Sequence, residues 1–321
     1  MILSALFSVL LLALIAKAQL CNQLPCVANA ACNANNQCEC NPGLAGNGRT
    51  YCEANKCICS TIADPHGFLF DSNQEVTANL PCSLFFTNYF NTSCNVQVYL
   101  DTETRGTGTN ANFRVFTRQM RATINNFANG LIASLTVDAS GVTVSSGSSI
   151  VTTSASDGFS VAEVSNCNTR MGYNDTYGAA YLSLPTGGPT YQQFCGDCDG
   201  TADENPGSTP ESQLSYYLQF LAPTAQQDGT YSSTCGTIQS TISSCSANRD
   251  AAANICLPYI DSFGKCLLSN GGIADYATLL SSFANCLSTV CSGNAATACT
   301  TLAALDTGSA SCSVTTPTSC P

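Results

Sequence analysis

Carboxylate side chains gather in one short segment, where acidic residues alternate with small ones. The segment reads Asp197-Cys-Asp199-Gly-Thr201-Ala-Asp203-Glu204-Asn205, so oxygen ligands fall on alternate residues around a glycine turn. Calcium prefers six to eight oxygen ligands, and a tight turn brings such ligands together. We therefore predict a structural calcium site in this segment. The alternative interpretation is a solvated acidic loop.

Two cysteines of the same region have the spacing of a redox motif, Cys195-Gly-Asp-Cys198. A thiol–disulfide enzyme needs a stabilised thiolate at a helix N-terminus or beside a cation. Asp197 and Asp199 disfavour a thiolate, and the Pro or aromatic lead-in of thioredoxin-like sites is missing from the sequence. We therefore predict two structural half-cystines, with a redox site as the alternative.

Composition excludes several other kinds of site. The chain has 321 residues, with 10 Lys or Arg, 21 Asp or Glu and a formal net charge of −11, which disfavours nucleic-acid binding. The single His, His66, excludes a multi-His metal centre. No spacing of Ser, His and acidic residues singles out a hydrolase site, so we expect no enzyme activity.

The N-terminus and the cysteines together indicate export. Residues 2–16 form one apolar run, shorter than the about 20 residues of a membrane span, and Ala16-Lys17-Ala18 fits a cleavage site. We predict a signal peptide at 1–18, with an uncleaved anchor as the alternative, and no membrane span after it. All 22 cysteines follow, and an even number in a secreted chain predicts a disulfide framework.

Cysteine density divides the chain into three segments. Six cysteines lie in 21–52, seven in 57–198 and nine in 235–320. Alternating apolar and polar residues, as in Phe159–Val164, are typical of strands in an antiparallel sandwich. We therefore predict a β domain over 57–205.

The period of the apolar residues changes in the last segment. Over 273–290 they recur at helical spacing, and the runs 251–268 and 295–305 also have a helical pattern. We predict short helices held by disulfides here. The proline-containing stretch 206–234 is predicted to be a linker, and 313–321 a tail.

The first six cysteines resemble an EGF-like domain in their spacing, Cys21-x4-Cys26-x5-Cys32-x5-Cys38-x-Cys40-x11-Cys52, and in a glycine-rich last loop. The resemblance implies a module over 19–53 with the pairs Cys21–Cys32, Cys26–Cys38 and Cys40–Cys52. A module of about 35 residues needs such cross-links because its core is small. The acidic signature of calcium-binding EGF modules is missing before Cys21, so we expect a spacer or adhesion module.

Both ends of the middle segment resemble a von Willebrand factor type D domain. The stretch Cys59-Ser-Thr-Ile-Ala63-Asp64-Pro65-His66-Gly67-Phe-Leu-Phe-Asp71-Ser72 is similar to the family opening Cys-x3-Gly-Asp-Pro-His-Tyr-x-Thr-Phe-Asp-Gly. The stretch Phe194-Cys195-Gly-Asp197-Cys198-Asp199-Gly is similar to the closing Leu-Cys-Gly-Asn-Phe-Asp-Gly. The resemblance implies calcium ligands at Asp197, Asp199, Asp203 and Glu204, with Asp71 as a more distant ligand. The chain departs from the family pattern at Ala63, Gly67, Ser72, Asp197 and Cys198.

The last segment resembles the eight-cysteine domain that often follows a type D domain, and we predict it over 235–312. Its eight cysteines would be Cys235, Cys245, Cys256, Cys266, Cys286, Cys291, Cys299 and Cys312. Because the middle and last segments each hold an odd number of cysteines, either a bridge joins them or each keeps one for another chain. We favour a bridge that involves the remaining Cys320, with pairing between chains as the alternative.

The bond between Asp64 and Pro65 gives a second functional hypothesis. In some type D relatives this bond breaks at mildly acidic pH, because the Asp carboxyl attacks its own carbonyl and the protonated Pro nitrogen leaves. His66 is the candidate proton donor. Ala63 replaces the family glycine, and glycine matters where φ must be positive, so an intact proline at a strand entry is favoured here.

These patterns predict a multidomain, mainly β, secreted extracellular protein with an EGF-like module, an antiparallel β-sandwich and a disulfide-stapled α-helical domain. Sequons predict surface N-glycosylation at Asn91 and Asn174. We expect a structural, adhesive or interaction protein of a matrix, mucus or coat, with calcium as cofactor. Its expected partners are other extracellular proteins, glycans or, through disulfides, itself. The alternatives are a self-processing protein cleaved at Asp64–Pro65 and a thiol–disulfide enzyme using Cys195 and Cys198.

Overall fold

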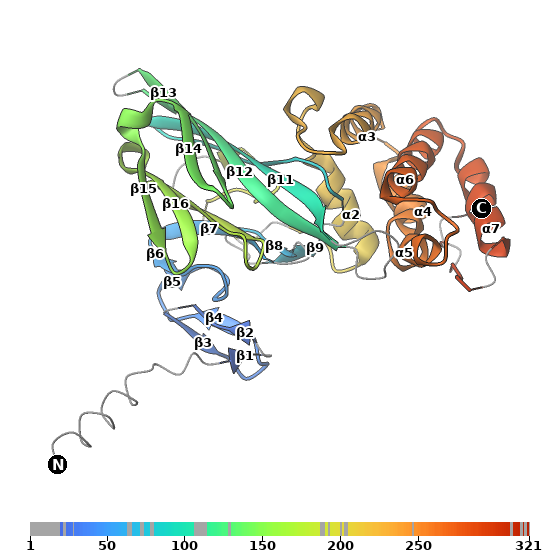
Figure 1. Ribbon diagram of the computed structural model, residues 1–321, viewed down its shortest axis with the longest axis horizontal. Helices are drawn as coiled ribbons and strands as arrows, with labels where there is room; N and C mark the ends of the chain where they lie inside the picture. The colour runs from blue at the N-terminus through green and yellow to red at the C-terminus, as the bar shows by residue number, and fades with distance from the viewer. Residues whose placement is uncertain are drawn as a thin grey trace, which may run out of the picture.

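The computed structural model describes residues 20–21, 24–27, 29–62, 66–70, 74–77, 80–105, 114–127, 130–186, 190–191, 193–199, 201, 205–245, 247–308, 311–314, 317 and 320. Two antiparallel β-sheets form its centre, with a small disulfide-rich segment before them and short helices after them (Figure 1). The prediction of a mainly β chain with antiparallel sheets, short helices and many disulfides is therefore confirmed. All 22 cysteines are paired within the chain, in eleven disulfides.

The N-terminal module (residues 20–54) is built from very short strands. They pair as β1 (Leu20–Cys21) with β2 (Leu24–Pro25), β3 (Ala30–Cys32) with β4 (Cys38–Cys40), and β5 (Leu44–Ala45) with β6 (Glu53–Ala54). Its disulfides are Cys21–Cys32, Cys26–Cys38 and Cys40–Cys52, the same pairs that the EGF-like resemblance implies. Cross-links therefore hold together a module that is too small for a large core.

The two large sheets pack face to face and form the sandwich (residues 56–191). The six-stranded sheet has the order β14-β13-β12-β11-β10-β19, and the seven-stranded sheet has the order β15-β16-β17-β18-β7-β8-β9. The strands of the first are β10 (Leu84–Phe90), β11 (Cys94–Arg105), β12 (Arg114–Asn126), β13 (Leu131–Asp138), β14 (Gly141–Ser146) and β19 (Thr190–Tyr191). The strands of the second are β7 (Lys56–Ile62), β8 (His66–Phe68), β9 (Glu75–Thr77), β15 (Thr152–Ser156), β16 (Phe159–Val164), β17 (Thr169–Asn174) and β18 (Ala179–Pro185).

Alternation along the strands builds the core between the sheets. On β11, Val96, Val98 and Leu100 are at most 1% exposed, whereas the residues between them are partly exposed. Burial of a side chain of this size contributes about 1.5–3 kcal/mol. Cys94 of β11 is bonded to Cys167, which precedes β17, so a disulfide also joins the two sheets.

The N-terminal module docks on the outer face of the seven-stranded sheet. The ring of Tyr51 stacks on that of Tyr181 of β18, with 4.2 Å between centroids and 5° between planes. Arg170 of β17 donates to the Tyr51 hydroxyl, and Ser183 Oγ donates to Glu53 Oε2 at 2.9 Å. The last loop of the module is therefore held against the sandwich by stacking and polar contacts.

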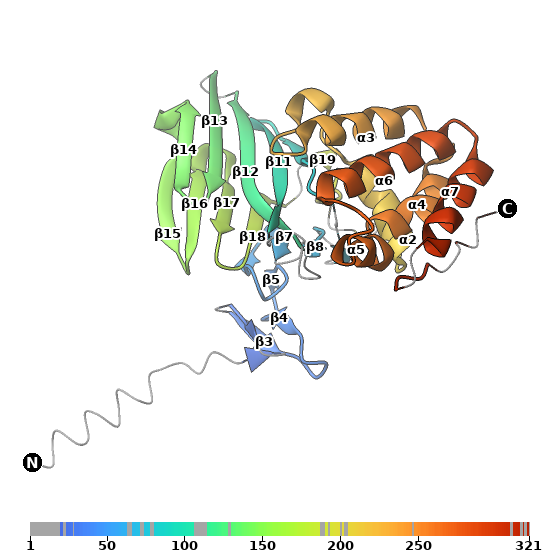
Figure 2. The same cartoon turned by 45° about the vertical axis from the view of Figure 1, so that its right-hand side comes forward.

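Within the described residues, six α-helices follow the sandwich and gather beside it (Figure 2). They are α2 (Pro210–Gln219), α3 (Ser232–Ser244), α4 (Arg249–Cys256), α5 (Ser262–Ser269), α6 (Tyr276–Cys291) and α7 (Ala295–Thr307). Four disulfides staple this helical segment: Cys245–Cys291, Cys256–Cys286, Cys266–Cys312 and Cys299–Cys320. In the part of the chain that the structure describes, no helix has the length and apolar character needed to cross a membrane.

The structure differs from two expectations in this region. Residues 206–234 are not a plain linker, because they include α2, which begins at Pro210, a residue type favoured at the first helical position. The bond between sandwich and helical segment is Cys82–Cys235, and Cys320 is bonded to Cys299 instead. Cys235 lies on α3, and its Sγ is 3.5 Å from the carbonyl oxygen of Pro81, the residue before Cys82. The fold therefore brings Cys235, and not Cys320, to Cys82. No cysteine is left for a bond between chains.

A buried charge cluster holds the start of the helical segment on the six-stranded sheet. Asp101 of β11 is fully buried and accepts two hydrogen bonds from the Arg121 guanidinium, at 2.6 and 2.8 Å. The amide of Gln119 donates both to Asp101 at 2.7 Å and to Asp228, just before α3, at 2.9 Å. Arg118 donates to Asp228 at 2.8 Å. The hydrogen bond to Asp101 raises the pKa of Arg121, so this guanidinium stays charged.

Candidate functional site at the acidic loop and the adjoining pocket

Two disulfides fix the start of the predicted calcium segment. Cys195 is bonded to Cys59 and Cys198 to Cys57, and both partners lie on β7 of the seven-stranded sheet. The N–H of Cys195 also donates to the carbonyl of Phe86 on β10, at 3.1 Å. The segment therefore leaves the sandwich at a place where both sheets hold it.

This pairing bears on the Cys195-x-x-Cys198 motif. The two sulfurs are bonded to different cysteines of β7, not to each other, and neither is a free thiol. The arrangement agrees with two structural half-cystines. A thiol–disulfide enzyme would need a free thiol or a bond within the motif, and this structure has neither.

Gly67, one of the departures from the family pattern, has a packing explanation. A Cβ atom at this position would lie 2.7 Å from Cζ of Phe194, the buried residue that precedes Cys195. Phe194 also contacts the rings of Phe86 and Tyr216. A tyrosine at position 67 would displace this aromatic group, so the glycine makes room for it.

The described part of the acidic loop contains two of the five predicted calcium ligands. Asp197 is half-buried beside the disulfides, and Asp199 is exposed with its Oδ1 accepting the N–H of Thr201 at 2.7 Å. Asp71, Asp203 and Glu204 lie outside the described residues. The two described carboxylates are suitable oxygen ligands for calcium, but they supply only part of the six to eight that the ion needs.

Cysteine sulfurs give no alternative metal site. Within the described residues, the group of potential ligands close enough to hold an ion is Cys21, Cys26 and Cys38. All three sulfurs are in disulfides, and metal binding needs thiolates.

His66 is tied to a carboxylate of the neighbouring strand. Its Nδ1 contacts Oε1 of Glu75 on β9, and this hydrogen bond lowers the pKa of Glu75 against the opposing effect of burial. Asp64 and Pro65, the residues of the predicted cleavage site, lie outside the described residues. The described geometry thus connects the proposed proton donor to Glu75.

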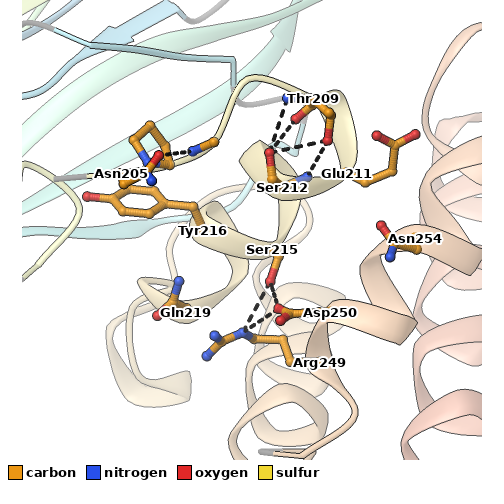
Figure 3. Close-up of a pocket in the computed structure, with 12 residues that line it drawn as sticks. Asn205, Thr209, Glu211, Ser212, Ser215, Tyr216, Gln219, Arg249, Asp250 and Asn254 are labelled. Carbon is orange, nitrogen blue, oxygen red and sulfur yellow. Dashed lines mark hydrogen bonds and ion pairs between the residues drawn. The ribbon is translucent and has the colours of Figure 1, made fainter.

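A pocket of about 440 Å³ lies where the chain after the acidic loop enters α2 (Figure 3). Asn205 and Pro206 form one side, and α2 and α4 supply the remainder. Thr209 caps α2, because its Oγ1 accepts the N–H of Ser212 at 3.2 Å and Ser212 Oγ accepts the N–H of Thr209. This capping box fixes the direction in which α2 leaves the loop.

Three polar side chains meet between the two helices of the pocket (Figure 3). Ser215 of α2 is 6% exposed, and its Oγ donates to Oδ1 of Asp250 on α4 at 2.5 Å. Arg249 Nε donates to the same hydroxyl at 3.3 Å. An activated serine nucleophile needs a base such as an imidazole, and the lining residues include no histidine. The group is therefore suited to hydrogen-bonding a polar ligand.

A second hollow of about 350 Å³ adjoins the first. It lies between α4, α5 and the C-terminal tail, and both hollows are lined by Glu211 and Asn254. Together they form a polar surface along the helical segment. The sequence patterns did not predict this surface. Thr209-Pro210 has the pattern of a helix start, and it would have placed Ser215 on a helix instead of in a linker.

The two sequons differ in exposure. Asn174 is only 5% exposed at the end of β17, so the expectation of a surface site there is not met. Asn91 lies in the turn between β10 and β11 and is half-buried. Its Oδ1 accepts the N–H groups of Ser93 and Cys94, at 2.8 and 2.7 Å. Asn91 thus remains the better candidate for glycosylation.

Comparison of the sequence with protein-family models and with curated proteins finds no match.

Proposed function

We propose that this protein is a secreted structural or adhesive protein that acts by binding other extracellular molecules, as part of a matrix, mucus or coat. The observation that carries this proposal is the way its three segments are joined. The N-terminal module is stacked on the sandwich through Tyr51 and Tyr181, and the helical segment is bonded to the sandwich through Cys82 and Cys235. Such joints keep binding surfaces in fixed orientation outside the cell.

The pairing of all 22 cysteines supports the extracellular part of the proposal. Disulfides persist in oxidising compartments and are rare in the cytosol. Calcium enters the proposal as a structural ion at the acidic loop, held by Asp197 and Asp199 with Asp71, Asp203 and Glu204. The ion would neutralise clustered carboxylates and tie the loop to the sandwich.

The test begins with expression through the secretory pathway. We expect the medium to contain protein that takes up no alkylating agent until it is reduced, as measured by intact mass. The native protein should be retained on immobilised matrix or mucus glycoproteins, and a reduced and alkylated sample is the control for non-specific adsorption. Intracellular retention with alkylatable thiols, or equal retention of the native and reduced samples, would contradict the proposal.

A further inference from the structure

The seven-stranded sheet ends in a strand that buries none of its side chains. All five residues of β15 are exposed, although β15 pairs along its whole length with β16. It forms the outer margin of the sandwich, on the side away from the helices (Figures 1 and 2). Neither the N-terminal module nor the helical segment covers this margin in the described structure.

The register of the hairpin shows which backbone groups reach the free edge. Asp157 and Gly158, with φ of 51° and 80°, form the two-residue turn, and Ser156 pairs with Phe159. Hydrogen-bonded and non-hydrogen-bonded pairs alternate along an antiparallel ladder. Ser156 and Ser154 therefore bond toward β16, whereas Thr153 and Ala155 direct their N–H and C=O groups outward.

This edge lacks the features that normally prevent strand addition. Natural edge strands are protected by charged side chains, especially Lys, by Pro or by cover from another element. Residues 139–156 contain no charged residue and no Pro. The nearest charge is Asp157 of the turn, which would lie at the opposite end of the paired strands in each copy, so two copies of this acidic chain (net charge −11) can approach along β15 itself without facing charges.

We propose that β15 is a self-association edge, and that its partner is β15 of a second copy. A two-fold axis midway between the Ser154 residues of the two copies places Thr153 opposite Ala155 of the second copy, so that the outward groups of each strand exchange hydrogen bonds. Association between copies must be non-covalent, because every cysteine is paired within the chain. This inference rests on the proposed interaction function and names one partner for it.

The association is weak for a single pair, since a five-residue strand contact covers less area than a standard interface of about 1,200–2,000 Å². It gains strength where many copies are held together, as in a secreted layer, because local concentration is then high. We therefore expect dimers at high micromolar concentration.

The experiment compares three proteins by sedimentation equilibrium over a concentration series. Ala155→Lys places a charge on the free edge, and Thr123→Lys places the same charge on an exposed position of β12 in the other sheet. We expect the dimer dissociation constant to rise at least tenfold for Ala155→Lys and to stay within twofold for Thr123→Lys. Both substitutions reduce the net negative charge, so a loss of association cannot come from greater overall repulsion.

Residue-resolved hydrogen exchange gives a second readout. The amides of Thr153 and Ala155 should become protected as the concentration rises, while that of Ser154, already bonded to β16, should not change. A wild type that stays monomeric to about 1 mM, or association that survives Ala155→Lys, overturns the inference. If monomeric protein still binds immobilised matrix, the inference fails and the proposed function stands. If dimers form but matrix binding is absent, the inference stands and the proposed function fails.

Discussion

Replacement of the buried Asp101 tests how strongly the helical segment is held on the sandwich. Asp101→Asn keeps the size of the side chain but removes the charge that faces Arg121 and Arg118, at 2.6 and 3.8 Å. Loss of one partner of a buried ion pair costs about 3–5 kcal/mol, because the remaining charge is left uncompensated. Arg121 keeps 24% of its side chain exposed and can regain some hydration, so we expect a smaller loss of about 2–4 kcal/mol.

Guanidinium unfolding with intact disulfides measures this loss, followed by tyrosine fluorescence and by circular dichroism. A loss near 3 kcal/mol corresponds to a lowering of Tm by about 5 °C, from an unfolding entropy of about 2.1 cal/mol/K per residue. Asp138→Asn is the matched control, since Asp138 lies on β13, two strands from β11 in the same sheet, and its carboxylate bonds only to nearby Ser140 in the described structure. We expect the control to change stability by less than about 0.5 kcal/mol.

The reasoning is refuted if Asp101→Asn and Asp138→Asn destabilise equally. A double-mutant cycle with Arg121→Met makes the test independent of general packing effects. It should return a coupling energy of about 1–3 kcal/mol between Asp101 and Arg121.

Three further predictions concern the other joints and the loop. Tyr51→Ala should lower the free energy of local opening of the N-terminal module by about 1–3 kcal/mol. We expect faster hydrogen exchange over residues 38–54, with little change in the unfolding midpoint of the sandwich. Unchanged exchange would contradict docking through Tyr51 and Tyr181. Because the pKa of Glu75 is lowered by His66, its stabilising contribution is complete above its ordinary pKa of 4.5 and is lost as the pH falls through the lower, folded value. Glu75→Gln should therefore flatten the decline of Tm below pH about 4.5, and an unaltered decline would argue against this pair. Removal of calcium with a chelator should lower Tm. Free calcium at 100 times its Kd stabilises the folded state by about 2.7 kcal/mol, and the chelator removes this contribution. Asp197→Asn should abolish the response of Tm to the chelator. If the chelator leaves the Tm of the wild type unchanged, the calcium site is excluded.

Local patterns in the sequence predicted local structure well. Alternation over 159–164 predicted a strand where β16 lies, and helical spacing over 273–290 predicted α6. The short intervals among the first six cysteines led, through the EGF-like resemblance, to the three disulfides that the N-terminal module contains. In each case the interacting residues are close in sequence, so spacing alone carries the information.

Contacts between distant segments could not be predicted in the same way. The number of cysteines showed that the middle and last segments needed a bridge or free thiols, but not that Cys235 would meet Cys82. Asp101 has the position of an outward residue on its strand, yet it is fully buried, and Gln119 and Arg121 connect it to the distant segment at Gln226 and Asp228. The helix α2 was missed for another reason, since the prolines around it suggest a linker although Pro210 stands at a helix start.

The bond between Cys82 and Cys235 has a consequence for biosynthesis. The two residues are 153 positions apart, so in the secretory route that we propose Cys82 would enter the lumen long before its partner has been translated. During that interval its sulfur has to stay reduced, or be shielded by an oxidoreductase, while Cys94 and other cysteines of the nascent chain emerge nearby. Maturation of the sandwich is thus complete only after the helices arrive, and chains truncated before Cys235 would expose an orphan thiol to quality control.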